Sequence, residues 1–345
     1  MWLYLVGWTI GWVMLARLRP LPERALARRA VAVIIPARNE EDVLANLLAP
    51  LAAQLRAGDE LIVVDDDSTD ATTEIASRFG AVVLRSPALD TAAWMGKPHA
   101  CFAGANASTA PLLVFVDADV EPSEDLLDRV AAALELHPGH VVSVQPWHRT
   151  QEWYEQASLL GNIVSLMGTG AMTPIGRRVA STVAFGPVLA VDRSTYERVG
   201  GHGHPAVRRT RVEDIALARA VGAAEVYTGR PDVRFRMYAG GLRSALDGWT
   251  RNMSSGLAAT PWWAVLAVTA WVWSVAGGWL AWPWAYPLTA LQLWVLGRRV
   301  GSFRWVTAAA FPVVTAIFVG VVARSLLLRV THRSIRWKGR LLLDN

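Results

Sequence analysis

Two carboxylates, Asp117 and Asp119, follow a run of apolar and β-branched residues in the segment VFVDADV at 114–120. Side chains alternate between the two faces of a strand, so a pair at i and i+2 points the same way. Two charges at the end of a buried strand are costly to desolvate unless a cation or hydrogen-bond donors meet them. The pattern therefore predicts a divalent metal held between carboxylate and diphosphate oxygens. For this motif alone, an acidic turn before a helix is an equally good interpretation.

A second acidic pair, Glu213 and Asp214, follows a basic stretch with arginines at 208, 209 and 211 and precedes a predicted helix at 215–220. A carboxylate at that place could take the proton of an attacking hydroxyl group. A cation opposite it would stabilise a leaving diphosphate without proton transfer. Taken by itself, the pair is better explained as an ordinary acidic first turn of a helix. Together with the other motifs, it makes Asp214 the best candidate for a catalytic base.

The elements that must position these residues are predicted from about residue 30 to residue 240, where strand and helix signals alternate. This alternation is typical of an α/β domain with a mostly parallel sheet. Strands are expected at 31–35, 61–64, 81–84 and 112–116, and helices at 39–55, 71–79 and 100–107. Polar loops follow three of these strands, and in such sheets ligands bind beyond the carboxyl ends of the strands. Gly200 and Gly201 permit a positive φ in a later loop.

The polar loops carry a resemblance to a known family. In order and spacing, five motifs are similar to those of the family 2 inverting glycosyltransferases: IIPARNEE at 34–41, VVDDDSTD at 63–70, GKPHA at 96–100, VDAD at 116–119 and VEDIALA at 212–218. Each motif is weak alone, but five in register are specific. The resemblance implies a GT-A fold, a nucleotide-sugar donor that is usually UDP-linked, and Mg2+ or Mn2+ on the Asp-x-Asp carboxylates.

The same resemblance suggests where the nucleotide binds. It implies that Pro36, Arg38 and Glu40 line the nucleotide pocket. Asp66, or its neighbour Asp65, is implied to meet the edge of the uracil ring. For the VVDDDSTD loop alone, a well-capped turn is a plausible alternative.

The resemblance also suggests the residues nearest the reaction. It implies that Lys97 lies near the donor, that Asp117 contacts the ribose or the metal, and that Asp119 is a metal ligand. A solvated surface lysine is the alternative for Lys97. Histidines 99, 202 and 204 are expected to make polar contacts, because no cysteine or carboxylate cluster at zinc spacing accompanies them.

The composition indicates a membrane protein. Hydrophobic residues make up 53% of the chain, and most of its 17 tryptophans follow residue 243. The net charge of +5 comes from basic residues beside apolar segments, which favours a membrane surface over nucleic acid. We expect an N-terminal anchor at 1–20, a catalytic domain at 30–240, an interfacial amphipathic helix at 241–258, a transmembrane region at 261–328 and a basic tail at 329–345. The single cysteine, Cys101, excludes an intrachain disulfide and fits a cytoplasmic domain.

The arginines after the N-terminal apolar segment place the catalytic domain on the cytoplasmic side of a multi-pass cell-membrane protein. Apolar segments are expected at 262–281, 284–296 and 306–322. Three full spans would leave the basic tail outside, against the positive-inside rule. One segment, either 284–296 or the one containing Pro312, is therefore expected to be re-entrant or interfacial.

The region that follows the catalytic domain bears on the acceptor. Many processive members of the family carry QxxRW there, whereas this chain has GWTRN at 248–252, which favours transfer of a single sugar to a lipid. A GW-x-(K/R)-N helix with a late WKGR, here at 337–340, is similar to carotenoid glycosyltransferases that act on diaponeurosporenoate. A polyprenyl-phosphate, hopanoid or ceramide acceptor stays open. The alternative outside enzymes is a transporter or scaffold with a degenerate nucleotide-binding domain.

Overall fold

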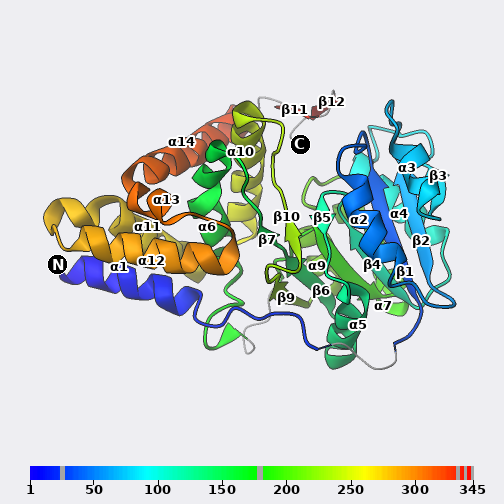
Figure 1. Ribbon diagram of the computed structural model, residues 1–345, viewed down its shortest axis with the longest axis horizontal. Coiled ribbons are helices and arrows are strands. Elements are labelled where there is room, and N and C mark those ends of the chain that lie inside the picture. Colours follow the sequence, from blue (N-terminus) through cyan, green and yellow to red (C-terminus); the bar gives the residue numbers. More distant parts are fainter. Residues whose placement is uncertain (24–27, 177–181, 332–334, 338–339, 343–345) are drawn as a thin grey trace. The chain divides into compact units, whose positions relative to one another are not determined.

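The structure is a computed structural model that describes residues 1–23, 28–176, 182–331, 335–337 and 340–342. The chain divides into two compact units (Figure 1). The first, which we call the α/β unit, contains Arg19–Trp147 and Ala180–Phe235. The second, the helical unit, contains Met1–Leu18, His148–Val179 and Arg236–Asn345. The segment 148–179 therefore interrupts the region that the sequence predicts as one catalytic domain.

The α/β unit is built on a sheet whose described strands follow the order β3-β2-β1-β4-β8-β6-β9. These strands are β1 (Val31–Ala37), β2 (Glu60–Asp65), β3 (Val82–Arg85), β4 (Leu112–Val116), β6 (Val141–Gln145), β8 (Val188–Asp192) and β9 (Ala224–Thr228). Only β8 runs antiparallel to its neighbours among the described strands, and every other pair is parallel. The predicted mostly parallel sheet is thus confirmed. A smaller described sheet contains β5 (Val120–Glu121), β10 (Arg234–Phe235) and β7 (Trp147–His148).

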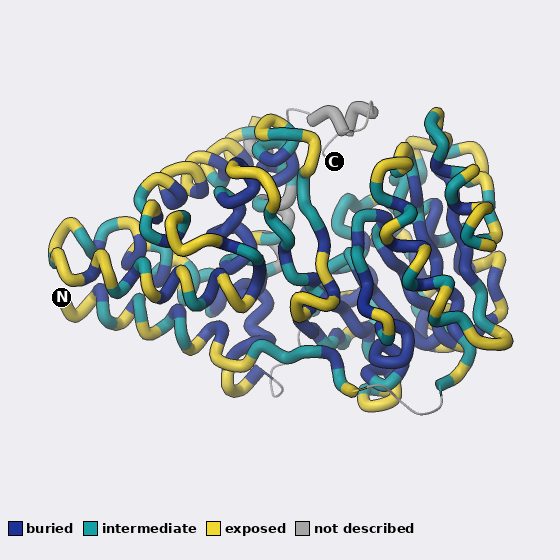
Figure 2. The backbone as a smooth tube through the Cα atoms, in the orientation of Figure 1, coloured by how far each residue is buried: buried dark blue, intermediate teal, exposed yellow. Residues whose placement is uncertain are grey.

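Both faces of the large sheet are buried. Along β1, Val31, Val33 and Ile35 belong to one core cluster, whereas Ala32 and Ile34 belong to the other. This alternation follows from the two-residue period of a strand, and it explains why the strand is apolar throughout. The covering helices are α2 (Leu44–Ala52), α3 (Thr72–Arg78), α4 (Gly96–Asn106), α5 (Leu126–Leu136), α7 (Arg193–Arg198), α8 (Pro205–Arg208) and α9 (Glu213–Val221), with the short turn η3 (Gly201–Gly203). Figure 2 shows the buried strands between these helices.

Two helices begin four or five residues away from their predicted first residue. The helix expected at 39–55 begins only at Leu44, because the preceding amides bind a neighbouring loop. The amide of Glu40 donates to Thr72 Oγ1 at 2.9 Å, and that of Glu41 donates to Asp70 Oδ2 at 3.1 Å. The helix expected from residue 100 begins at Gly96, since Pro98 in the first helical turn costs no intrahelical hydrogen bond.

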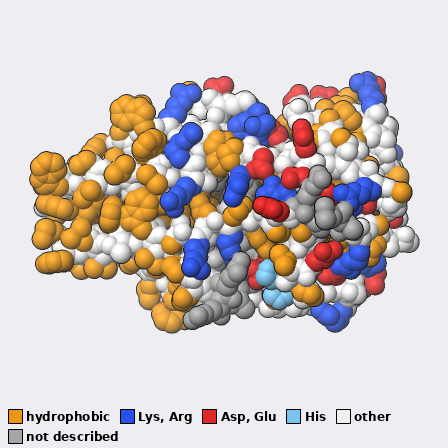
Figure 3. Space-filling view, turned by 60° about the horizontal axis from the view of Figure 1, so that its bottom comes forward, with side chains coloured by type: hydrophobic (Ala, Val, Ile, Leu, Met, Phe, Trp, Pro, Cys, Tyr) orange, Lys and Arg blue, Asp and Glu red, His pale blue; other side chains and the backbone are white. Residues whose placement is uncertain are grey.

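The helical unit contains two helices that are long and apolar enough to cross a membrane, by length and composition: α11 (Trp262–Ala281) and residues 311–328 of α14 (Phe311–Val330). Its other described helices are α1 (Trp2–Met14), η1 (Trp153–Ser158), α6 (Leu159–Thr169), α10 (Leu242–Ala259), α12 (Ala285–Val300) and α13 (Trp305–Ala309). Large hydrophobic side chains of α1, α11, α12 and α14 are exposed, and Figure 3 shows hydrophobic side chains gathered over this unit. A short hairpin, β11 (Ile335–Trp337) with β12 (Arg340–Leu342), follows.

Several details of this unit differ from the expectations. The segment predicted at 306–322 is divided between α13 and α14, and Pro312 lies in the first turn of α14, where its missing N–H is not needed. The predicted amphipathic helix is α10, but Trp249 is only 8% exposed and donates a 2.8 Å hydrogen bond to Ser158 Oγ. Trp249 therefore packs within the unit and does not face lipid. Of the late WKGR motif, Lys338 and Gly339 lie outside the described residues, as does much of the basic tail.

Candidate active site

The Asp-x-Asp pair lies where it was predicted, directly after the carboxyl end of β4. The chain turns there, because the amide of Asp117 donates to Pro187 O at 2.9 Å and the amide of Val120 donates to Asp117 O at 3.2 Å. Desolvation, followed by the negative charges of Asp117 and Glu40, raises the pKa of Asp119 to about 7. Three carboxylates thus come close together at this edge of the sheet, in a place that disfavours negative charge.

Lys97 joins this pair to the acidic pair of α9. Its Nζ lies 2.7 Å from Asp117 Oδ1 and 2.7 Å from Glu213 Oε1. Desolvation by itself would lower the pKa of Lys97, but the charges of Asp117 and Glu213 outweigh it and raise the pKa well above its usual value. Lys97 is therefore a cation fixed between two carboxylates. The first turn of α4 positions it, and that turn is held where the amide of Met95 donates to Arg208 O at 2.8 Å.

The acidic pair at the start of α9 divides into two different groups. Glu213 has a side chain that is 6% exposed and is paired with Lys97. Asp214 has no such described ion pair within the part of the chain that the structure covers, and desolvation, followed by the charge of Glu213, raises its pKa to about 7. A carboxylate of this kind is half ionised at neutral pH, so it can both accept and release a proton.

Gly186, in the loop before β8, leaves space between these groups. A Cβ atom at this position would lie 3.1 Å from Lys97 Nζ and 3.4 Å from Asp214 Oδ2. Asp214 therefore lies beside Lys97, and a Cβ atom at 186 would press on Lys97 Nζ and contact Asp214. The sequence analysis did not single out Gly186 or the pairing of Glu213 with Lys97. The placing of Lys97 between the two acidic pairs could have been suspected, because the pairs need a counter-charge.

The residues assigned to the nucleotide lie on the loops after β1 and β2. Arg38 donates from Nη1 to the backbone oxygen of Asp66 at 2.8 Å, and its guanidinium lies 3.8 Å from Asp66 Oδ2. The amide of Asp66 in turn donates to Ala37 O at 2.8 Å. Asp65 is 4% exposed and accepts a hydrogen bond from Ser68 N at 3.1 Å. Asp65 thus stabilises its own loop, which leaves Asp66 the more accessible of the two predicted uracil contacts.

These two loops are held to each other by local polar contacts. Asn39 accepts from Thr69 N at 2.8 Å and donates its own amide to Ser68 Oγ at 3.0 Å. Asn39 and Asp67 both have positive φ, a conformation that Asn and Asp tolerate better than most residues. Pro36 lies within β1 opposite Val64, so the strand itself places it beside the second loop. The structure brings the predicted nucleotide residues together at the carboxyl ends of β1 and β2.

The donor set fits a hard divalent cation. Asp117 and Asp119 offer carboxylate oxygens from one turn, and oxygen is the ligand that Mg2+ and Mn2+ prefer. Desolvation, followed by the negative charges of Asp117 and Glu40, raises the pKa of Asp119, and a bound cation would favour its ionised form. The histidines predicted to make polar contacts do so: His99 Nδ1 lies 3.2 Å from Ser86 Oγ, and His202 Nδ1 lies 3.0 Å from the hydroxyl oxygen of Tyr196.

Comparison with known proteins agrees with this arrangement. Residues 32–194 match the profile described as Glycosyl transferase family 2. The chain is 31% identical over 334 residues to the 4,4'-diaponeurosporenoate glycosyltransferase of Staphylococcus aureus strain USA300, covering 90% of this chain and 88% of that protein. The corresponding enzyme of strain MRSA252 has the same identity and coverage. Among solved structures, a mannosyltransferase from Pyrobaculum calidifontis in complex with GDP-Man and Mn2+ is similar in fold, with a TM-score of 0.57 and 18% identity over 94% of each chain.

Proposed function

The chain belongs to glycosyltransferase family 2, and on this premise we propose that it transfers a single sugar from a UDP-sugar to a lipid acceptor with inversion of configuration. The observation that carries the proposal is the meeting of Asp117, Lys97, Glu213 and Asp214 at the carboxyl edge of the sheet. Inverting transfer in one displacement needs a stabilised leaving group on one side and a base on the other.

The leaving diphosphate would be held by the groups around β4. A divalent cation, Mg2+ or Mn2+, bound by Asp119 and Asp117 would neutralise the charge that develops on the diphosphate as the anomeric bond breaks. Lys97, fixed by two carboxylates, presents a further positive charge beside Asp117. The nucleotide would lie along the loops after β1 and β2, with Pro36, Arg38 and Glu40 lining its pocket and Asp66, supported by Asp65, at the uracil edge.

Asp214 would act as the base. The neighbouring Glu213 is already engaged by Lys97, whereas desolvation brings the pKa of Asp214 to about 7. A group with that pKa accepts a proton at neutral pH more readily than an ordinary aspartate does. With a hydroxyl acceptor, the proton would pass to Asp214 as the oxygen attacks the anomeric carbon, and the UDP would leave from the opposite face. A carboxylate acceptor would attack without giving up a proton.

A lipid acceptor is supported by the relatives and by the helical unit. The similar enzymes of S. aureus act, by their names, on 4,4'-diaponeurosporenoate, a carotenoid whose name denotes a carboxylate. Two apolar helices of spanning length, α11 and α14, suit a chain that meets such a substrate at a membrane. We therefore propose a multi-pass cell-membrane protein with the α/β unit on the cytoplasmic side, where nucleotide-sugars are available.

The proposal is tested with the full chain purified in detergent, a labelled UDP-sugar and a lipid extract. We expect one labelled glycolipid, with a single sugar of inverted anomeric configuration, whose formation stops on chelation of divalent metal and resumes when Mg2+ or Mn2+ is returned. A polymer in place of a single sugar would contradict single transfer. Label on an acid-labile phosphate-linked lipid would identify a polyprenyl-phosphate acceptor instead.

A further inference from the structure

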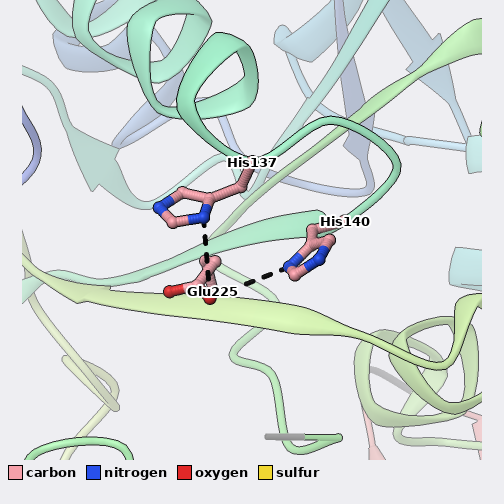
Figure 4. A group of neighbouring side chains, drawn as sticks. All are labelled: His137, His140 and Glu225. Carbon is pink, nitrogen blue, oxygen red and sulfur yellow. Dashed lines mark ion pairs between the residues drawn. The ribbon is translucent and has the colours of Figure 1, made fainter. Parts of the chain in front are cut away.

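Three potential metal ligands meet in the α/β unit, away from the site described above. Figure 4 shows that His137 and His140 both turn their rings toward Glu225. Their Nδ1 atoms each lie 3.7 Å from Glu225 Oε1, and one ligand atom from each residue lies within 4.8 Å of the other two. His140 Nδ1 is shielded from solvent and makes no hydrogen bond within the described part of the chain. A shielded ring nitrogen without a hydrogen bond is costly unless a ligand meets it.

The local sequence fixes the two histidines in place. Residues 137–140 form a tight turn in which Pro138 is the second residue and Gly139, with φ of 78°, is the third. The amide of His140 closes the turn by donating to His137 O at 3.2 Å. Proline followed by a residue of positive φ is typical of a type II turn, so its backbone is set before any ligand binds. The two imidazoles therefore come from one rigid turn.

The third ligand is brought to this turn by the sheet. β6 begins directly after His140, and its residue Val142 lies opposite Glu225 of the parallel strand β9. Glu225 is 15% exposed, and its other carboxylate oxygen, Oε2, accepts from Arg19 Nη1 at 3.0 Å. Arg19 thus orients the carboxylate and leaves Oε1 directed at the two rings. Outer partners of this kind are what fix ligating carboxylates in metal sites.

We propose that His137, His140 and Glu225 form a Zn2+ site with water as its fourth ligand. Two neutral imidazoles and one carboxylate suit zinc, and tetrahedral ligand atoms about 2.0–2.1 Å from the metal lie roughly 3.4 Å apart. The observed 3.7 Å separations are close to that value, so the rings need only a small rotation to coordinate. A Mg2+ ion would favour an all-oxygen set and suits this cluster poorly.

The site is separate from the predicted catalytic metal. β4 and β6 run in the same direction, because β8 lies between them and is antiparallel to both. Asp117 follows the carboxyl end of β4, whereas the cluster lies at the amino ends of β6 and β9. The two sites therefore lie at opposite ends of the parallel strands. We assign the zinc a structural role, in which it ties the turn after α5 to β9.

The test uses the full-length, tag-free chain in detergent, with Asp119→Asn as the parent so that the predicted catalytic site does not contribute. Zn2+ binding is measured by equilibrium dialysis, and the thermal midpoint is measured with and without Zn2+. We expect one Zn2+ per chain and a higher midpoint with Zn2+. Since loss of an outer partner alone weakens metal sites by about 10–100-fold, His137→Ala and His140→Ala should each weaken binding by at least about tenfold.

Two further variants separate a zinc site from a simple ion pair. His204→Asn, in another loop of the same unit, should bind Zn2+ like the parent, because Asn keeps the contact to Ala206 N. Glu225→Gln should also weaken binding, since it keeps the shape but removes the charge. If His140→Ala binds Zn2+ as tightly as the parent, or if the parent binds none, the proposal is wrong. His140→Ala could also lower the thermal midpoint by the same amount with and without Zn2+. That result would identify the cluster as an ion pair only.

Discussion

At the scale of single residues, the site depends on how one lysine divides four carboxylates into different roles. Lys97 contacts Asp117 and Glu213, whereas desolvation, together with the charges of neighbouring acids, raises the pKa values of Asp119 and Asp214 to about 7. The two carboxylates that Lys97 does not pair with are Asp119, which is predicted to bind the metal, and Asp214, which is predicted to accept a proton. Neighbouring acids can thus serve different functions because their environments differ.

The metal prediction concerns Asp119. Asp119→Asn keeps the size of the side chain but removes the charge, so it should abolish metal-stimulated sugar transfer. The fold should be as stable as before or more stable, because a desolvated charge next to Asp117 and Glu40 is removed. Turnover against Mg2+ or Mn2+ concentration, together with the thermal midpoint, checks this. The matched control is Asp67→Asn, since Asp67 is exposed and Asn tolerates its positive φ. Unchanged metal dependence in Asp119→Asn would remove Asp119 from the site.

The base prediction concerns Asp214. With a hydroxyl acceptor, Asp214→Asn should lower turnover by about 10²–10⁴, the usual share of general-base catalysis, while the affinity for the UDP-sugar stays the same. A carboxylate acceptor arrives without a proton, so its transfer should depend much less on Asp214. Turnover with the two acceptor classes and donor binding by calorimetry provide the measurement. If donor affinity falls together with turnover, Asp214 is a binding residue.

Glu213→Gln is the variant to compare with Asp214→Asn, although it is expected to have effects of its own. Glu213→Gln breaks a buried contact with Lys97, so we expect a lower thermal midpoint and weaker donor binding. Asp214→Asn should show neither effect. The two variants are therefore distinguished by which quantity changes, and an exchange of their effects would move the base to Glu213.

A pH prediction follows from the same carboxyl group. Desolvation and the charge of Glu213 raise the pKa of Asp214 to about 7, so below that pH Asp214 is increasingly protonated and cannot act as a base. Turnover with a hydroxyl acceptor should rise about tenfold per pH unit up to about 7 and then level off. The residual activity of Asp214→Asn should lack this rise. A rise that persists unchanged in Asp214→Asn would assign the titration to another group.

At the scale of elements, the first strands of the large sheet could be predicted, whereas the contacts between its loops could not. The apolar runs of β1, β2 and β4 are continuous because both faces of the sheet are buried, and such runs are visible in the sequence. The helix expected at 39–55 failed because Glu40 and Glu41 bind partners on the loop after β2, which is distant in the chain. The pairing of Lys97 with Glu213 was missed for the same reason. Contacts between distant segments leave no local pattern.

One buried element gives a prediction on stability. His202, in η3, is 1% exposed, and desolvation, followed by the charge of Lys97, lowers its pKa to about 3. The unfolded histidine has a pKa near 6.5, so between about pH 6.5 and 3 the unfolded state binds the extra proton. Stability that is present above about pH 6.5 is therefore lost as the pH falls through this window. His202→Gln, which keeps a polar partner for Tyr196, should flatten that dependence in thermal unfolding.

The other strongly shifted histidine is the control for that measurement. His148 belongs to the helical unit and is buried, and desolvation lowers its pKa to about 4. His202→Gln leaves this second titration in place, so a residual slope should remain. A slope identical to that of the parent chain would show that His202 contributes nothing to acid stability.

At the scale of the whole molecule, the sequence predicts the order of the parts but not which segments belong together. The α/β region and the apolar C-terminal helices are both visible in composition. The assignment of His148–Val179 to the helical unit is not, because α6 is apolar in the same way as a core element of the α/β unit. Its partners in the described residues are supplied by the last third of the chain. Trp249 of α10 reaches Gly161 and Ser158, where a Cβ at 161 would lie 2.8 Å from the indole ring.

This grouping changes what a truncation should do. A fragment of residues 1–239 keeps α6 but loses α10, α12 and the other helices that cover it. Leu159 loses its contact near Gly297, and Gly170 loses the ring of Trp263. Exposing each large side chain that is buried in the full chain costs roughly 1.5–3 kcal/mol of stability. We therefore expect this fragment to aggregate without detergent and to transfer no sugar to lipid.

The single substitution Trp249→Ala tests the same idea within the intact chain. Loss of a buried indole typically costs about 3–5 kcal/mol, so the thermal midpoint should fall clearly. Trp249→Phe keeps a ring against Gly161 but removes the hydrogen bond to Ser158, which is worth only about 0.5–1.5 kcal/mol. The thermal midpoint of Trp249→Phe should therefore lie between those of Trp249→Ala and the parent chain. Because Trp249 lies in the helical unit and the metal and base residues lie in the α/β unit, UDP-sugar affinity at a temperature where the variants are folded should stay at the parent value.

If residues 1–239 remain monomeric and bind UDP-sugar as the full chain does, the segment 148–179 is stable without the C-terminal helices and its assignment to the helical unit has no energetic meaning.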